Sequence, residues 1–102
     1  MQEVVIGGVE NGVLHVALSG DIDLGNAEEF YQAVMAGYKA SPADVCFDCA
    51  ALNFIDSTTL GTFVKILKSV RADGYEMSLV HLQPKIKILF LICSLDSIIT
   101  IL

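Results

Sequence analysis

One short segment carries residue types that could take part in chemistry. Asp56, Ser57, Thr58 and Thr59 lie together where an apolar stretch gives way to a helical pattern. A serine at a helix start lies where unpaired backbone N–H groups and the positive end of the helix dipole converge. Two interpretations follow. Ser57 or Asp56 caps the helix, a common role for both residue types, or the Ser57 hydroxyl accepts a phosphoryl group that the helix end stabilises.

Two acidic residues, Asp21 and Asp23, form a second candidate site in a polar stretch, residues 19–25, that leads into a helical pattern. Acids in a loop are usually solvated, and neither the spacing nor the number of these two matches a calcium loop. The sequence also has no P-loop and no dinucleotide-binding glycine pattern. We therefore predict no metal and no cofactor.

Motifs of known enzymes are incomplete. His15 and His81 fall within predicted strands, and nothing in the sequence places either beside Ser57, as a serine hydrolase would require. The G-x-S-x-G pattern is absent around Ser57. Cys46 and Cys49 form a C-x-x-C, but residues i and i+3 of a strand point to opposite faces. We predict no enzyme activity, and we assign these cysteines, with Cys93, to core packing.

Hydrophobic periodicity predicts five strands and three helices. The strands are expected at residues 4–6, 13–18, 45–49, 75–82 and 98–102, and the helices at 27–38, 57–73 and 85–95. Asn11-Gly12 predicts a type I′ hairpin turn between the first two strands, and Asn26 with Glu29 predicts a capping box. The element order, β-β-α-β-α-β-α-β, indicates an α/β fold: a mixed, mostly parallel β-sheet with flanking helices.

The composition limits the classes of function. The chain has 102 residues, of which 54 % are hydrophobic, and a net charge of −6. We predict a single domain, residues 1–102, that does not bind nucleic acid, because no basic stripe is present to neutralise phosphates. No apolar run approaches the ~20 residues of a membrane-spanning helix, and Met1-Gln2-Glu3 lacks a basic leader, so no membrane insertion is expected. Three cysteines predict free thiols in the cytoplasm.

The helix expected at residues 85–95 is apolar nearly all round, with Lys85 and Lys87 as its main charges. One side must face the sheet, and the other side would be exposed in a monomer. We expect either that this side binds a second copy or a hydrophobic partner, or that residues 98–102 fold back and cover it.

Several segments, taken in order, resemble the STAS domain, the family of bacterial anti-sigma factor antagonists. They are Gly20–Ala27, Asp48, Phe54–Gly61, Gly74 and Pro84–Ile86. The family usually has Asp-Ser-Ser/Thr-Gly-Leu-Gly at the helix start, whereas Thr59 replaces the first glycine here. We expect the β-branched Thr59 side chain to stand near the hydroxyl, where a kinase backbone needs room.

The resemblance implies a protein-binding switch. The unphosphorylated chain would bind an anti-sigma factor that is also a serine kinase and holds the ATP. Phosphorylation of Ser57 would release it, and a PPM-type serine phosphatase would reset the switch. The partner would contact Asp21, Asp23, Asp56, Ser57, Thr58 and Thr59. Asp48 interrupts an otherwise apolar strand, and from this position we expect a paired structural carboxylate near the end of the sheet. The alternative, which Thr59 favours, is a non-switching STAS scaffold or a regulatory subunit of a membrane transport complex.

Overall fold

The computed structural model describes residues 3–102 and has the predicted order of elements. The fold class is confirmed as mixed α/β. The strands are β1 (Glu3–Glu10), β2 (Val13–Ile22), β3 (Asp44–Ile55), β4 (Met77–Val80) and β5 (Thr100–Ile101), and the helices are α1 (Ala27–Ala40), α2 (Ser57–Ala72), α3 (Pro84–Ile92) and the short 3-10 helix η1 (Leu95–Ser97).

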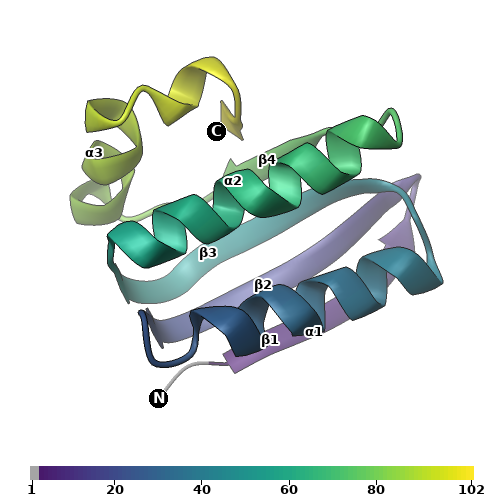
Figure 1. Ribbon diagram of the computed structural model, residues 1–102, viewed down its shortest axis with the longest axis horizontal. Helices are drawn as coiled ribbons and strands as arrows, with labels where there is room; N and C mark the ends of the chain where they lie inside the picture. The colour runs from purple at the N-terminus through teal and green to yellow at the C-terminus, as the bar shows by residue number, and fades with distance from the viewer. Residues whose placement is uncertain (1–2) are drawn as a thin grey trace.

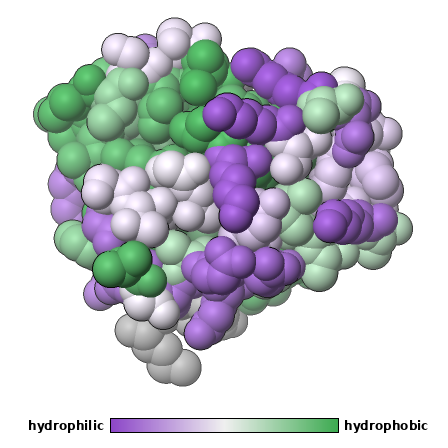
Figure 2. Space-filling view, viewed as in Figure 1, coloured by the Kyte–Doolittle hydropathy of each residue, from purple (hydrophilic) through white to green (hydrophobic). Residues whose placement is uncertain are grey.

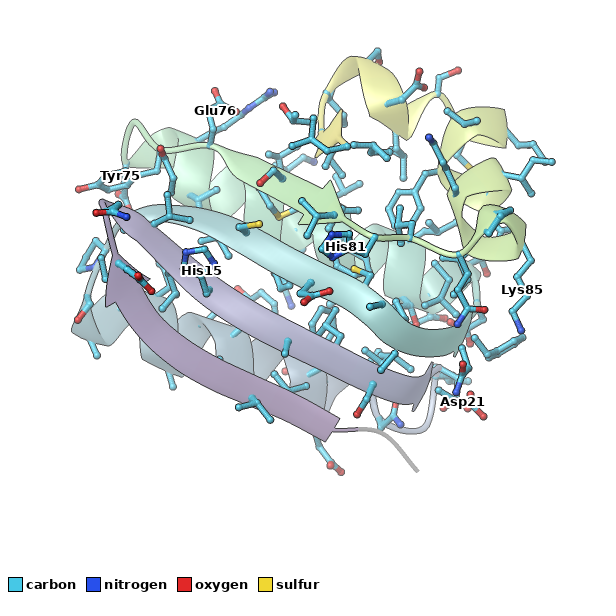
Figure 3. The ribbon with its side chains drawn as sticks, turned by 180° about the vertical axis from the view of Figure 1, so that it is seen from behind. His15, Asp21, Tyr75, Glu76, His81 and Lys85 are labelled. Atoms are coloured by element: carbon cyan, nitrogen blue, oxygen red, sulfur yellow. The ribbon has the colours of Figure 1, made fainter. Side chains whose placement is uncertain are left out.

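The strands form one sheet in the order β1-β2-β3-β4-β5, in which β1 is antiparallel to β2 and the other neighbours are parallel. Asn11 and Gly12 both have positive φ, 54° and 78°, as the predicted type I′ turn requires. Helices α1 and α2 lie side by side on one face of the sheet (Figure 1). Seen from behind, the other face carries no helix within residues 3–102 (Figure 3). The helix-covered face therefore holds the core.

Four buried phenylalanines join the helices to the sheet. Phe63 of α2 makes edge-to-face contacts with Phe30, Phe47 and Phe90, at centroid distances of 5.2, 5.4 and 5.5 Å. These rings come from α1, β3 and α3, so Phe63 is the point where all three helices meet the sheet. Edge-to-face pairs add to the stabilisation from apolar burial.

Three strands are longer than the sequence pattern predicts: β1 covers Glu3–Glu10 and not only residues 4–6, and β2 and β3 extend beyond their predicted ends. Residues 19–22, expected in a polar loop, belong to β2, and Phe54 and Ile55 end β3. The extra residues pair with each other across the sheet, Asp21 with Phe54 and Ile22 with Ile55. This pairing supplies backbone hydrogen bonds that periodicity within one segment does not reveal. In contrast, β4 is shorter than the predicted 75–82.

The predicted capping box at α1 is wrong. Asn26 occupies the N-cap position, but its side chain makes no capping bond. Its Oδ1 instead accepts from the Asp23 N–H at 2.8 Å, and its Nδ2 donates to the Asp21 carbonyl at 2.9 Å. Asn26 therefore shapes the loop that precedes α1.

The three cysteines have different surroundings. Cys49 is buried, and this burial, with the nearby Asp48, raises the pKa of its thiol to about 12. Cys46 is half-buried on the opposite face of β3, as the C-x-x-C spacing in a strand predicts, so its assignment to the core is wrong. The prediction for Cys93 is wrong, because Cys93 is exposed at the end of α3.

Helix α3 keeps an exposed apolar side. The C-terminal segment does not cover it, because β5 pairs with β4 at the sheet edge and Ile88, Leu91 and Ile92 stay exposed. Pro84 begins the helix, as predicted. Within residues 3–102, none of the helices has the length and apolar character needed to cross a bilayer.

Candidate partner-binding site

The candidate site lies at the end of the sheet where the neighbouring parallel strands β2 and β3 finish. Ile22 and Ile55 are paired across the two parallel strands, so the residues that follow them, Asp23 and Asp56, leave the sheet side by side. The loop after β2 leads into α1, and α2 begins directly after Asp56 (Figure 1). Two segments that are distant in sequence therefore form one surface.

Ser57 and Thr58 are the first two residues of α2, and both are exposed. The N-cap is Asp56, not Ser57: its Oδ1 accepts a hydrogen bond from the Thr59 N–H at 3.0 Å. The Ser57 hydroxyl is consequently not needed to cap the helix. It is exposed at the positive end of the helix dipole, where a second protein can reach it.

Asp56 also anchors the neighbouring loop. Its Oδ2 accepts a hydrogen bond from the Leu24 N–H at 2.9 Å. Burial alone would oppose ionisation, but the bonds from the Thr59 and Leu24 N–H groups and the Thr59 hydroxyl outweigh it and hold the pKa of Asp56 below its ordinary value. Asp56 is therefore an ionised clamp between the loop and the start of α2.

Acidification should release this clamp. Because the folded-state pKa of Asp56 lies below the ordinary value of about 3.9, its contribution to stability is fully present above that pH and is lost as the pH falls through the folded-state pKa. We expect the loss of unfolding free energy in Asp56→Asn to be largest near neutrality and to shrink below about pH 4. Urea denaturation of both proteins across this range measures it. Glu10→Gln, an exposed substitution in β1, is the control, and a pH-independent difference at Asp56 would contradict this assignment.

Thr59 lies beneath the surface, not on it. It is 0 % exposed, and its hydroxyl lies 2.6 Å from the Ile22 carbonyl and 3.0 Å from Asp56 Oδ1. The expectation that Thr59 touches the partner is therefore corrected, because no atom of its side chain reaches the surface. The side chain also does not stand in the way of a kinase, since it points toward the end of β2.

The Thr59 hydroxyl should contribute measurably to stability. Thr59→Val preserves the shape but leaves the buried Ile22 carbonyl without this donor, at a cost of about 1 to 3 kcal/mol. Thr59→Ser keeps the hydroxyl and should lose less. Thr62→Val is a matched control, because the Thr62 hydroxyl donates to the Thr58 carbonyl within the same helix, α2. Urea unfolding gives the free energies, and faster hydrogen exchange at the Leu24 amide would report the loosened clamp. Equal stability of Thr59→Val and Thr59→Ser would show that the hydroxyl does not act in this way.

Asp23 and Asp21 differ in their roles. Asp23 is half-buried; its Oδ1 accepts from the Gly25 N–H at 2.9 Å, and its carbonyl accepts from the N–H groups of Asn26 and Ala27. Asp21 is exposed near the end of β2, at the same end of the molecule as Lys85 (Figure 3). Asp23 thus shapes the loop, whereas the Asp21 carboxylate is free within residues 3–102 of any ion pair.

Leu24 is a further exposed residue of this surface that was not predicted from the sequence. This residue is 76 % exposed at the tip of the loop, and its backbone N–H is held by Asp56. An aliphatic side chain held outward beside Ser57 offers a partner an apolar contact next to the acidic groups. The available signal was a leucine placed between polar and glycine residues in a predicted loop.

The remaining polar residues lie elsewhere. Asp48 accepts from the Ala50 N–H and pairs with His81 Nδ1, both at 3.1 Å, and these bonds, the Ala50 bond first, hold the pKa of Asp48 below its ordinary value. His15 and His81 both appear on the helix-free face of the sheet (Figure 3). His81 follows β4 with a φ of 62°, so it is not in a strand as predicted. Within residues 3–102, no three His, Cys, Asp or Glu side chains are grouped to hold a metal ion.

A model of the STAS domain family matches residues 7–102. The chain belongs to this family. The STAS fold is shared with an anti-sigma factor antagonist from Mycobacterium paratuberculosis (TM-score 0.87, 22 % identity, 99 % of this chain and 85 % of that one). It is also shared with the protein tm1081 from Thermotoga maritima (TM-score 0.84, 24 % identity, 97 % and 83 %). A third structure with this fold is the Bacillus cell fate determinant SpoIIAA in its phosphorylated form (TM-score 0.75, 15 % identity, 98 % and 91 %).

Proposed function

We propose that this STAS domain is a phosphorylation-controlled binding protein of the anti-sigma factor antagonist type. The unphosphorylated chain binds an anti-sigma factor that is also a serine kinase, in the cytoplasm, and phosphorylation of Ser57 ends the complex. The observation that carries this proposal is the exposed Ser57 hydroxyl at the first position of α2, beside a helix cap that Asp56 already supplies. A structural neighbour known in a phosphorylated form supports it.

The switch needs no catalytic group from this chain. In the forward step, the Ser57 oxygen attacks the γ-phosphorus of ATP held by the kinase, the bond to the β-phosphate oxygen breaks, and ADP leaves. The hydroxyl proton passes to a base of the kinase. A PPM-type serine phosphatase hydrolyses the phosphoester with water and regenerates the hydroxyl. This chain is therefore a substrate and a binding module rather than an enzyme.

Electrostatic repulsion is the proposed cause of release. A phosphoserine carries roughly −1.5 to −2 charges. At Ser57 this charge joins the ionised Asp56 and two further acids at the same end of the sheet, Asp21 near the end of strand β2 and Asp23 in the loop that follows it. A partner surface matched to a neutral hydroxyl would then face a dense negative charge. A coupling free energy of about 1 to 3 kcal/mol between phosphorylation and partner binding is enough to change the affinity roughly 5- to 150-fold.

The non-switching alternative loses its steric basis. It was favoured because Thr59 replaces the family glycine next to the acceptor, but the Thr59 side chain is buried and bonded to the Ile22 carbonyl. A phosphorylation assay separates the two functions. After incubation with the anti-sigma factor kinase and ATP, we expect one phosphate per chain on Ser57 by peptide mass spectrometry.

Two variants make the assay specific. Ser57→Ala should accept no phosphate, whereas Thr58→Ala, one residue further along the same exposed turn, should be modified like the wild type. A wild-type chain that binds the kinase tightly yet stays unmodified would contradict the switch and favour the scaffold function.

A further inference from the structure

Helix α3 presents an apolar face to solvent. Ile86 and Phe90 point into the core, but Ile88, Leu91 and Ile92 are 53, 44 and 73 % exposed. Figure 2 shows hydrophobic surface over the end of the molecule that α3 occupies in Figure 1. Contiguous exposed apolar patches on soluble domains usually mark an interaction site.

Opposite charges lie near the two ends of this face. Lys85 lies in the first turn of α3, and Asp96 lies in η1, just beyond the other end of the helix; both are exposed. Within residues 3–102, neither takes part in an ion pair. In an antiparallel pair of α3 helices with Ile88 of one copy opposite Ile92 of the other, Lys85 of each copy comes opposite the end that carries Asp96 of the other. This is the self-complementarity that a two-fold interface requires.

We propose that the α3 face, defined by Ile88, Leu91 and Ile92, is a self-association surface that packs antiparallel against the same face of a second copy. The apolar stripe forms the contact, and two reciprocal Lys85–Asp96 pairs set its direction. One short helix covers less than the roughly 800 Å² per partner of a standard interface. The association is therefore reversible and concentration-dependent. It does not rest on the proposed function of Ser57.

Sedimentation equilibrium on the whole chain tests the apolar contact. We expect the wild type to shift from monomer to dimer as its concentration rises to about 1 mM. Ile88→Glu should raise the dissociation constant at least about tenfold, because a carboxylate cannot be buried without a partner. Val5→Glu is the matched control. The exposed fraction of Val5, 48 %, is similar to the 53 % of Ile88, but Val5 lies on β1 and not on α3. A wild type that stays monomeric overturns the proposal and leaves the face to a different partner. An equal increase of the dissociation constant in Ile88→Glu and Val5→Glu also overturns it.

A charge exchange tests the direction of packing. Lys85→Glu and Asp96→Lys should each weaken dimerisation, and the double variant should restore it. Lys39→Glu makes the same charge change at the end of α1 and should have no effect. Circular dichroism confirms that each variant is folded. Failure of the double variant to recover dimerisation would overturn the antiparallel arrangement.

Discussion

Ser57→Asp should bind the anti-sigma factor kinase at least about fivefold more weakly than the wild type. The substitution places a permanent negative charge at an exposed position beside the ionised Asp56 clamp. Aspartate carries less charge than phosphoserine, so its effect should fall toward the lower end of the range of about 5- to 150-fold expected for the modified protein. Isothermal titration of each variant into the kinase measures the difference.

Ser57→Ala should keep wild-type affinity. Because Asp56 is the N-cap, the Ser57 hydroxyl supports no capping bond, and the change in stability should stay within about 0.5 kcal/mol. Lys39→Gln, which makes the net charge more negative by one as Ser57→Asp does but lies in the last turn of α1, controls for net charge. Equal affinities of Ser57→Asp and Ser57→Ala would refute repulsion as the cause of release.

Phe63→Ala should destabilise the fold by about 3 to 5 kcal/mol. Phe63 is fully buried and its ring contacts three other phenylalanines, from α1, β3 and α3. Truncation removes these contacts and leaves a cavity that four elements would have to close together. A loss of this size is a large part of the 5 to 15 kcal/mol typical of small domains.

Phe54→Ala is the control for this change, because Phe54 is 50 % exposed near the end of β3. It should cost much less than Phe63→Ala in urea denaturation followed by circular dichroism. Similar losses for the two variants would show that the ring cluster is not the centre of the core.

Sequence periodicity predicted the elements because each helix buries one face. In α1, for example, Phe30, Val34 and Tyr38 recur at helical spacing and are all buried. The ends of the strands were predicted less well. The last residues of β2 and β3 are strand because they pair with each other, and this pairing joins positions more than 30 residues apart.

In the candidate site, too, the residues could be predicted from the sequence but the contacts between distant segments could not. Ser57, Asp56 and Asp23 were predicted from their resemblance to the family motif, and the structure places them at one edge. The burial of Thr59 was missed because the acceptor of its hydroxyl, the Ile22 carbonyl, is distant in sequence. The Asp56 bond to Leu24 was missed for the same reason. The contact between Asp56 and Leu24 forms because β2 and β3, the strands that precede these residues, end side by side.

The most direct measurement compares the affinity of the same protein for its kinase before and after stoichiometric phosphorylation of Ser57. We expect tight binding before modification, a loss of affinity of about 5- to 150-fold after it, and full recovery once a PPM-type phosphatase has removed the phosphate. Undiminished binding of the phosphorylated chain would show that Ser57 is not a switch.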